Sequence, residues 1–336
     1  MLAEWQPSAH ARARTSAVYL AMQKQAADPV CDGCHAPLAT RTSGPAGREG
    51  VSCDACHTLR AVTPGHARAE ITLATDDMVR YGPLCDAKDH YFHRMGCSPL
   101  HTEAELCAAC HLWRRPLAGG GWLPVFTEYA DWKDGPYATE GVQCQTCHMP
   151  GDEAEVAVGS PPRPAVPHHG FLGRDGGLRK TALTLTVTLS REGGDFVLET
   201  LLANVGAGHF VPAGLPERRI LLTILALSGD KQATTTMTYK YGRVLTDDAG
   251  KEVPFYLATK QGKDSRIPPR GSIKDVVRFP PDAGIDRGSE ILIRVLERPL
   301  SEEMAAALGV PAPADHLLLE TTLSASKLPI TVKVPK

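Results

Sequence analysis

The sequence predicts an α+β chain in which an N-terminal half of short helices and loops is followed by an antiparallel β-sandwich of the immunoglobulin-like type. Two observations carry this prediction. All ten cysteines of the 336 residues lie before residue 150, and a period-two alternation of apolar and polar residues begins at Thr181. The change of pattern predicts two domains, residues 1–172 and residues 178–336, each able to bury its own core.

The overall composition excludes several classes of protein. The formal net charge is -2 at pH 7, so the chain offers no large basic surface to nucleic acid or to an anionic membrane. No apolar run approaches the roughly 18 residues of a membrane span, which predicts a protein that is not integral to a membrane. No signal peptide is visible, because the first residues lack a long apolar stretch and a small-residue cleavage site.

The N-terminal half repeats one pattern, C-x-x-C-H, four times, as CDGCH, CDACH, CAACH and CQTCH. The pattern is the attachment signal for c-type haem: two cysteines three residues apart present both thiols to one edge of the porphyrin, and the adjacent histidine reaches the iron. The sequence therefore predicts four covalently bound haem c groups. They are held by Cys31, Cys34, Cys53, Cys56, Cys107, Cys110, Cys144 and Cys147, with His35, His57, His111 and His148 as iron ligands.

Zinc is the competing interpretation of the paired cysteines, since C-x-x-C units also build tetrahedral thiolate sites. Zinc accounts for the cysteines but not for the histidine that follows every second one. A disulfide framework is a weaker alternative, because a chain of this length does not need one. Four haems in about 150 residues are expected to form most of the core of the N-terminal domain.

The group on the far side of each iron decides between electron transfer and catalysis. Nine histidines remain for these four positions: His10, His66, His90, His93, His101, His168, His169, His209 and His316. Ser8 is a candidate N-cap, which places His10 in the first turn of an alanine-rich helix. We take His10 as a haem ligand, and an exposed histidine at a helix start is the alternative.

Two further segments offer ligands. His90 and His93 lie between Cys85 and Cys97, which can close a disulfide in an oxidising compartment, although the sequence does not show the pairing. We take His93 as the ligand and His90 as the alternative.

The second of these segments is a proline-rich linker, PPRPAVPHHGF, that ends in His168 and His169. One of the two is expected to turn back onto a haem, and we take His169. His66, in a TPGHAR turn, is a reserve candidate, and His101 stays unassigned.

From Thr181 onward the alternation predicts strands. TALTLTVTLS places Leu183, Leu185, Val187 and Leu189 on one face. Further strands are expected at DFVLETLLANV, RRILLTILALSG, DVVRFPPD and EILIRVLE, followed by a short helix at EEMAAAL and a last strand at ITVKV.

The turn ANVGAGHFVPAG places His209 between two of these strands. Its glycines let the backbone approach another group closely, and Val211-Pro212 is expected to be extended and stiff. We therefore expect His209 to reach a haem of the N-terminal half, and a loop histidine bonded to its own turn is the alternative.

Six stretches carry a resemblance to a known family: WQPSAHA, EGVSCDACH, ELCAACH, EGVQCQTCHMP, HHGFLG and NVGAGHFVPAGLPER. The chain resembles a broad family of bacterial multihaem c-type cytochromes, which includes tetrahaem electron carriers and larger relatives linked to nitrogen and metal respiration. The resemblance implies four distal ligands, namely His10, one of His90 and His93, one of His168 and His169, and His209. The chain departs from the family at Pro212-Ala213-Gly214, where PTG is common.

The leading hypothesis is an electron-transfer protein, not an enzyme, in which four bis-histidine haems pass single electrons between respiratory partners. The expected partners are other cytochromes or quinol-linked membrane complexes, and no nucleic acid. Covalent haem attachment takes place outside the cytoplasm, so the periplasm, the extracellular space or the cell surface is the expected location.

Two alternatives remain. A reductase of small nitrogen or sulfur oxyanions needs one open haem, and Arg114, Arg115, Arg218 and Arg219 are its candidate positive charges. The chain has no C-x-x-C-K motif, so the catalytic haem of the pentahaem nitrite reductases is not indicated, and nothing supports the crosslinked haem of hydroxylamine oxidoreductases. The other alternative is a homo-oligomer or extracellular filament in which one copy lends a histidine to a haem of the next.

Overall fold

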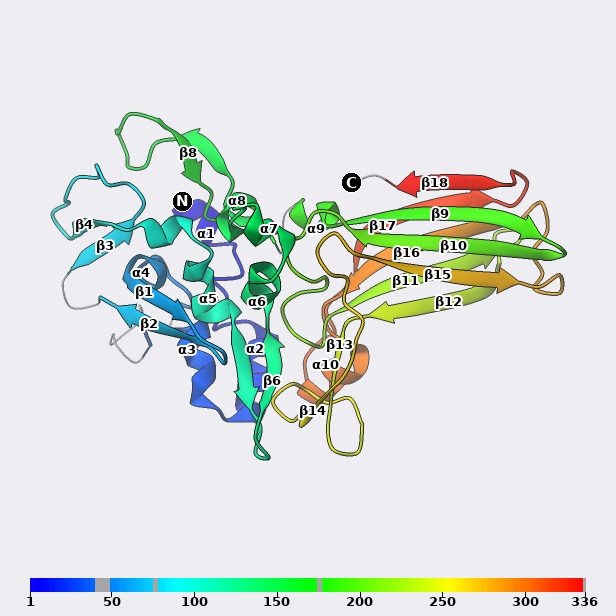
Figure 1. Cartoon of the computed structure of the whole chain (residues 1–336), viewed down its shortest axis with the longest axis horizontal. Coiled ribbons are helices and arrows are strands. Elements are labelled where there is room, and N and C mark those ends of the chain that lie inside the picture. Colours follow the sequence, from blue (N-terminus) through cyan, green and yellow to red (C-terminus); the bar gives the residue numbers. More distant parts are fainter. Residues whose placement is uncertain (40–48, 75–77, 174–176, 335–336) are drawn as a thin grey trace. The chain divides into compact units, whose positions relative to one another are not determined.

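The computed structural model describes all residues except 40–48, 75–77, 174–176 and 335–336. The chain divides into two compact units (Figure 1). Unit 1 comprises Met1–Arg179 and Ala305–Val310, and unit 2 comprises Lys180–Met304 and Pro311–Lys336. Within the described residues, no helix is long and apolar enough to cross a membrane.

Short helices make up much of unit 1. They are α1 (Leu2–Trp5), α2 (Ala17–Ala26), α3 (Asp32–His35), α4 (Cys53–His57), α5 (Glu105–His111), α6 (Glu128–Lys133), α7 (Pro136–Thr139) and α8 (Cys144–His148), with 3-10 turns at Pro29–Cys31 and Pro99–Thr102. Helix α9 (Leu178–Thr181) and the expected helix α10 (Glu302–Leu308) each contain residues of both units.

Unit 1 also contains strands, where the sequence predicted only helices and loops. They form the two-stranded pairs β1 (Leu59–Pro64) with β2 (Ala69–Leu73), β3 (Val79–Gly82) with β4 (Arg94–Cys97), β5 (Trp113–Pro116) with β6 (Trp122–Phe126), and β7 (Gly151–Ala154) with β8 (Arg163–Pro167). Three pairs are antiparallel and β3 with β4 is parallel. At four to six residues, these strands are too short to show a reliable period-two pattern.

The predicted start of the first long helix is wrong. Ser8 does accept a hydrogen bond from the Ala11 N–H, but helix α2 begins only after Ser16, whose hydroxyl accepts from the Tyr19 N–H. The carbonyl of His10 accepts from Ala13 N at 3.2 Å, within a turn, and from Val51 N at 3.0 Å, outside the segment. Residues 6–15 are therefore a series of turns, held by a segment distant in sequence.

Unit 2 is built on two four-stranded antiparallel sheets (Figure 1). One has the order β15 (Ser272–Phe279), β10 (Asp195–Asn204), β9 (Leu183–Glu192) and β18 (Ile330–Val334). The other has the order β12 (Ala233–Tyr241), β11 (Arg219–Leu227), β16 (Glu290–Arg298) and β17 (His316–Ser324). A small pair joins β13 (Arg243–Thr246) to β14 (Lys260–Asp264).

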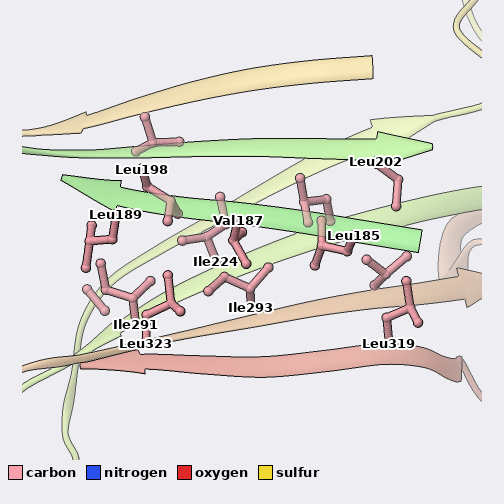
Figure 2. Packing of buried hydrophobic residues seen from close by; sticks show 14 of the residues in the cluster. Leu185, Val187, Leu189, Leu198, Leu202, Ile224, Ile291, Ile293, Leu319 and Leu323 are labelled. Atoms are coloured by element: carbon pink, nitrogen blue, oxygen red, sulfur yellow. The ribbon is translucent and has the colours of Figure 1, made fainter. Parts of the chain in front are cut away.

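A single apolar cluster fills the space between the two sheets. Figure 2 shows Leu185, Val187 and Leu189 of β9 facing Ile291 and Ile293 of β16. All five side chains are fully buried, so the apolar face predicted for β9 is confirmed. The burial of these branched side chains is the main source of stability of unit 2.

Candidate haem-binding site

All four C-x-x-C-H motifs lie in helices of unit 1. They occupy α3 with the preceding Cys31, all of α4, the second half of α5, and all of α8. In a helix, residues three and four apart share a face, so each motif presents its two thiols and its histidine together. None of the eight motif cysteines is in a disulfide. Each helix therefore offers the set of side chains that covalent haem attachment needs.

Two of the motif histidines, His35 and His57, are held at the ring nitrogen that iron does not use. The Nδ1 atom of His35 lies 2.7 Å from the Ala13 carbonyl oxygen, and that of His57 lies 2.6 Å from the Tyr81 carbonyl oxygen. For His111 the neighbour is the Glu128 carboxylate, 4.0 Å from Nδ1. A donor bond from Nδ1 fixes the tautomer that leaves Nε2 free to bind a metal. These contacts suit axial haem ligands.

The residue after the first cysteine ties the second and fourth motifs, as well as the first, to the rest of unit 1. Asp54 accepts two hydrogen bonds from Arg80, at 2.7 and 2.9 Å, and Gln145 donates to the Glu103 carbonyl at 2.7 Å. In the third motif the same position is Ala108, which is fully buried. Sequence reasoning did not select Arg80, because nothing near it in the chain points to α4.

Two of the remaining histidines lie opposite motif histidines. The ring centroids of His10 and His111 are 6.3 Å apart, and those of His169 and His57 are also 6.3 Å apart. Two imidazoles on opposite sides of one metal ion, each with a bond of about 2 Å to it, have ring centres about 6 Å apart. The spacing of both pairs thus fits an iron between them.

Burial keeps these two candidate ligands neutral. Burial, together with the neighbouring His111 and His148, lowers the pKa of His10 to about 4. Burial is also the main cause that lowers the pKa of His169. The Nδ1 atom of His10 is buried with no hydrogen-bond partner among the described residues. A neutral imidazole is the form that binds a metal.

His168 and His169 differ in what their nitrogens contact. Nδ1 of His169 lies 2.8 Å from the Pro167 carbonyl oxygen, which is the arrangement of the motif histidines. Nδ1 of His168 instead accepts from the Gly170 N–H at 3.1 Å, and its Nε2 lies 3.8 Å from the Glu4 carboxylate. His169 therefore has the geometry of a ligand, and both nitrogens of His168 are otherwise engaged.

His101 is a second neighbour of His57, with ring centroids 5.3 Å apart and nearly parallel planes. Its Nε2, however, lies 3.1 Å from the Cys56 carbonyl oxygen, so this nitrogen faces backbone. His66 contacts Trp122, with ring centroids 6.0 Å apart. Neither has the geometry shared by His10 and His169.

His90 and His93 lie in a loop closed by a disulfide between Cys85 and Cys97. The two histidines pair with each other through their backbones, and their ring centroids are 5.6 Å apart. Nδ1 of His93 is buried without a hydrogen-bond partner in the described part of the chain. The structure brings neither ring into contact with a motif histidine within the described residues.

In unit 2, the fully buried Asn204 holds the turn that carries His209. Its side-chain nitrogen donates to the His209 carbonyl at 3.0 Å, and its side-chain oxygen accepts from Ala207 N at 3.0 Å. His209 Nδ1 lies 3.0 Å from the Phe210 carbonyl oxygen. The peptide bond between Val211 and Pro212 is cis.

The donor set does not fit zinc. Across the described residues, no three of the His, Cys, Asp and Glu side chains converge as a bare metal ion would need. A structural zinc site requires four such ligands around one point. The paired thiols with their adjacent histidines and the two spaced histidine pairs fit iron held within a porphyrin instead.

The comparisons with known proteins agree with this chemistry. The family model described as cytochrome c554 and c-prime matches residues 1–58. A solved structure, a penta-heme cytochrome c552 from Thermochromatium tepidum, is similar with a TM-score of 0.73. The two sequences are 21% identical, and the match covers 96% of this chain and 95% of that one. No curated protein matches this chain.

These findings support a multihaem c-type cytochrome. Both matches are to cytochromes, the class of protein that the C-x-x-C-H motifs predict. The similar structure is a five-haem protein, whereas this chain has four C-x-x-C-H motifs. At this level of identity the likeness shows the fold alone.

Proposed function

We propose that the protein is an electron carrier with four covalently attached haems, each bound at one C-x-x-C-H motif. The observation that carries the proposal is the pair of 6.3 Å separations, His10 to His111 and His57 to His169. A bound haem c supplies a one-electron couple. The chain holds the attachment thiols and orients the rings of His35, His57 and His169 through carbonyl groups. Burial lowers the pKa of His10 and His169.

The two pairs assign sixth ligands to specific motifs. His10 serves the third motif, whose own ligand is His111, and His169 serves the second, whose own ligand is His57. His93 and His209 are the proposed ligands for the remaining two motifs, on the sequence and resemblance described above. Iron with two imidazoles needs little rearrangement when its charge changes, which favours fast electron transfer.

The proposed partners are other redox proteins, either cytochromes or quinol-linked membrane complexes. The proposed location is the periplasm or the cell surface, because haem is attached to c-type cytochromes there. For unit 2, the immunoglobulin-like type of sandwich is proposed on its two facing sheets.

A reductase is the second candidate. The printed ring spacings support a second histidine for His57 and His111, whereas the sixth ligands proposed for the other two motifs rest on the sequence and the resemblance. An iron without a sixth protein ligand could bind a small nitrogen or sulfur oxyanion. This function requires a high-spin haem in the wild-type protein.

Low-temperature electron paramagnetic resonance of the oxidised, fully loaded protein separates the candidates. We expect only low-spin iron in the wild type and about one added high-spin haem in each of H10A, H169A and H209A. H168A is the matched control for H169A and is expected to match the wild type. A high-spin haem in the wild type would favour the reductase, and low-spin spectra for H10A and H169A would contradict the assigned pairs.

A further inference from the structure

The first motif has an aromatic neighbour that the proposed function does not use. The ring of Tyr19 stacks on the ring of His35, with centroids 4.1 Å apart and planes 20° apart. Tyr19 is buried, with 7% of its surface exposed. This contact covers one face of the imidazole that would bind the first iron.

The sequence places Tyr19 there through helix α2. Ser16 caps the helix by accepting from Tyr19 N, so Tyr19 lies in the first turn and Gln23 lies one turn further on the same face. Both side chains donate to the same carboxylate oxygen of Asp32, Tyr19 from its hydroxyl at 2.6 Å and Gln23 from its amide at 3.1 Å. Asp32 is the residue after the first cysteine of the motif, so α2 is bonded directly to the haem-attachment segment.

A third donor completes this arrangement. Arg14 Nη2 lies 3.3 Å from the other Asp32 carboxylate oxygen. The Asp32 carboxylate thus receives a hydroxyl, an amide and a guanidinium, which together fix its position. Because Tyr19 is held at its hydroxyl by Asp32 and at its backbone by α2, its ring has little freedom to turn away from His35.

The His35 imidazole is therefore constrained in two directions. The Ala13 carbonyl binds its Nδ1 edge at 2.7 Å, and Tyr19 covers its face. Rotation of the ring about its Cβ–Cγ bond would break the first contact and collide with the second. In a metal site, groups that do not touch the metal commonly set the orientation of the ligand in this way.

We propose that Tyr19 is a positioning residue of the first haem, which fixes the plane of the His35 imidazole while Asp32 holds the Tyr19 hydroxyl. This inference rests on the proposed function, because it requires haem attached at Cys31 and Cys34. The plane of an axial imidazole determines how the iron orbitals split, and so the principal g values of the low-spin iron. It also contributes to the reduction potential of that haem.

The test compares Y19L, which removes the ring, with Y19F, which keeps the ring and removes only the hydroxyl. Y129F is the matched control: Tyr129 is also buried and also donates to a carboxylate beside a motif, Glu105 Oε1 at 2.9 Å. The ring of Tyr129, however, packs at a tilt of 41° against Trp132 rather than on a motif histidine. All variants are studied as the fully loaded protein, with the haem number determined from the intact mass.

We expect Y19L to keep four haems and to shift the largest g value of one low-spin signal, together with one step of a potentiometric titration. Y19F should restore the wild-type g value because the stack remains, and Y129F should match the wild type. Wild-type spectra for a Y19L protein with four haems would overturn the inference. A wild-type protein without haem at Cys31 and Cys34 would instead refute the proposed function.

A second measurement avoids the risk that Y19L fails to load haem. Reduced low-spin iron is diamagnetic, so nuclear Overhauser contacts between the Tyr19 and His35 rings can be sought in the reduced wild-type protein. Such contacts are expected from a centroid distance of 4.1 Å. Their absence in a protein that carries the first haem would overturn the inference.

Discussion

The two units differ in the residues that form their cores. The core of unit 2 is a continuous cluster of leucine, isoleucine and valine from both sheets. A cluster in unit 1 consists of alanines, Leu112, Tyr129 and Trp132 around α5 and α6, and its motif cysteines are half-buried or exposed. The difference indicates that unit 2 is stabilised by its own side chains, and it agrees with our proposal that unit 1 binds haems, which would complete its core.

Removing the haems is the strongest test of this comparison. With all eight motif cysteines replaced by serine, and Cys85 and Cys97 retained, we expect unit 1 to lose its fixed structure and unit 2 to keep it. Hydrogen exchange of the full chain, followed by mass spectrometry, should show fast exchange in α4, α5 and α8. Exchange in β9, β10 and β11 should stay slow. Equal protection of both units would refute the idea that haem completes unit 1.

Truncating one core residue should affect unit 2 strongly. Leu198 on β10 is fully buried among the residues of the cluster (Figure 2), and Leu198→Ala is expected to lower the free energy of unfolding by about 2–5 kcal/mol. Leu201 on the same strand is 40% exposed, and Leu201→Ala should cost far less. Urea unfolding followed by the sheet signal in circular dichroism measures both. Equal losses would mean that the cluster is not the source of stability.

Sequence reasoning succeeded where a pattern is local. The apolar alternation predicted β9, and the runs of Leu, Ile and Val predicted β10, β11 and β16. A strand that is buried on one face has an apolar side chain at every second residue. It missed β12, whose ATTTMTYKY stretch is rich in threonine and lies at a sheet edge. It also missed the short strand pairs of unit 1, which are defined by their partners rather than by their own sequence.

The candidate site also has one part that could be predicted from the sequence and one part that could not. The four motifs are visible in sequence because the porphyrin fixes the spacing of its thiols and its ligand. The partners of His57 and His111 could not be read from sequence, since His10 and His169 come near them only in the folded unit. The helix start at Ser8 was predicted wrongly for a related reason: Val51, distant in sequence, binds the carbonyl of His10.

Removing the disulfide of unit 1 should affect a smaller part of the structure than removing the haems. It closes a loop between residues 12 positions apart, and a loop of this size is expected to contribute about 3 kcal/mol by restricting the unfolded chain. In a C85S/C97S double variant we expect faster hydrogen exchange confined to residues 85–97 and no change in unit 2. Faster exchange throughout unit 1 would show that this loop, as well as the haems, holds the unit together.

The smallest expected effect is the pH dependence of stability that the buried Glu217 carboxyl group causes in unit 2. Glu217 is 5% exposed. One carboxylate oxygen accepts from Phe255 N at 2.9 Å, and the other is buried with no partner among the described residues. Burial raises the pKa of Glu217 above its usual 4.5, against the lowering effects of the Phe255 and Glu217 N–H groups and of Arg219. The nearby Glu252 carboxylate acts in the raising direction.

The sign of the pH dependence follows from that raised pKa. The folded protein keeps the proton of Glu217 to a higher pH than the unfolded chain, so the stability from this group is full below the unfolded pKa and is lost as pH rises through the folded value. Each unit of pKa difference corresponds to about 1.4 kcal/mol. In Glu217→Gln this loss should vanish, so urea midpoints of the variant should fall less steeply than those of the wild type above pH 4.5. Glu199→Gln, at an exposed site on β10, is the control. Identical pH profiles for the wild type and Glu217→Gln would show that the buried carboxylate does not affect the stability of the core of unit 2.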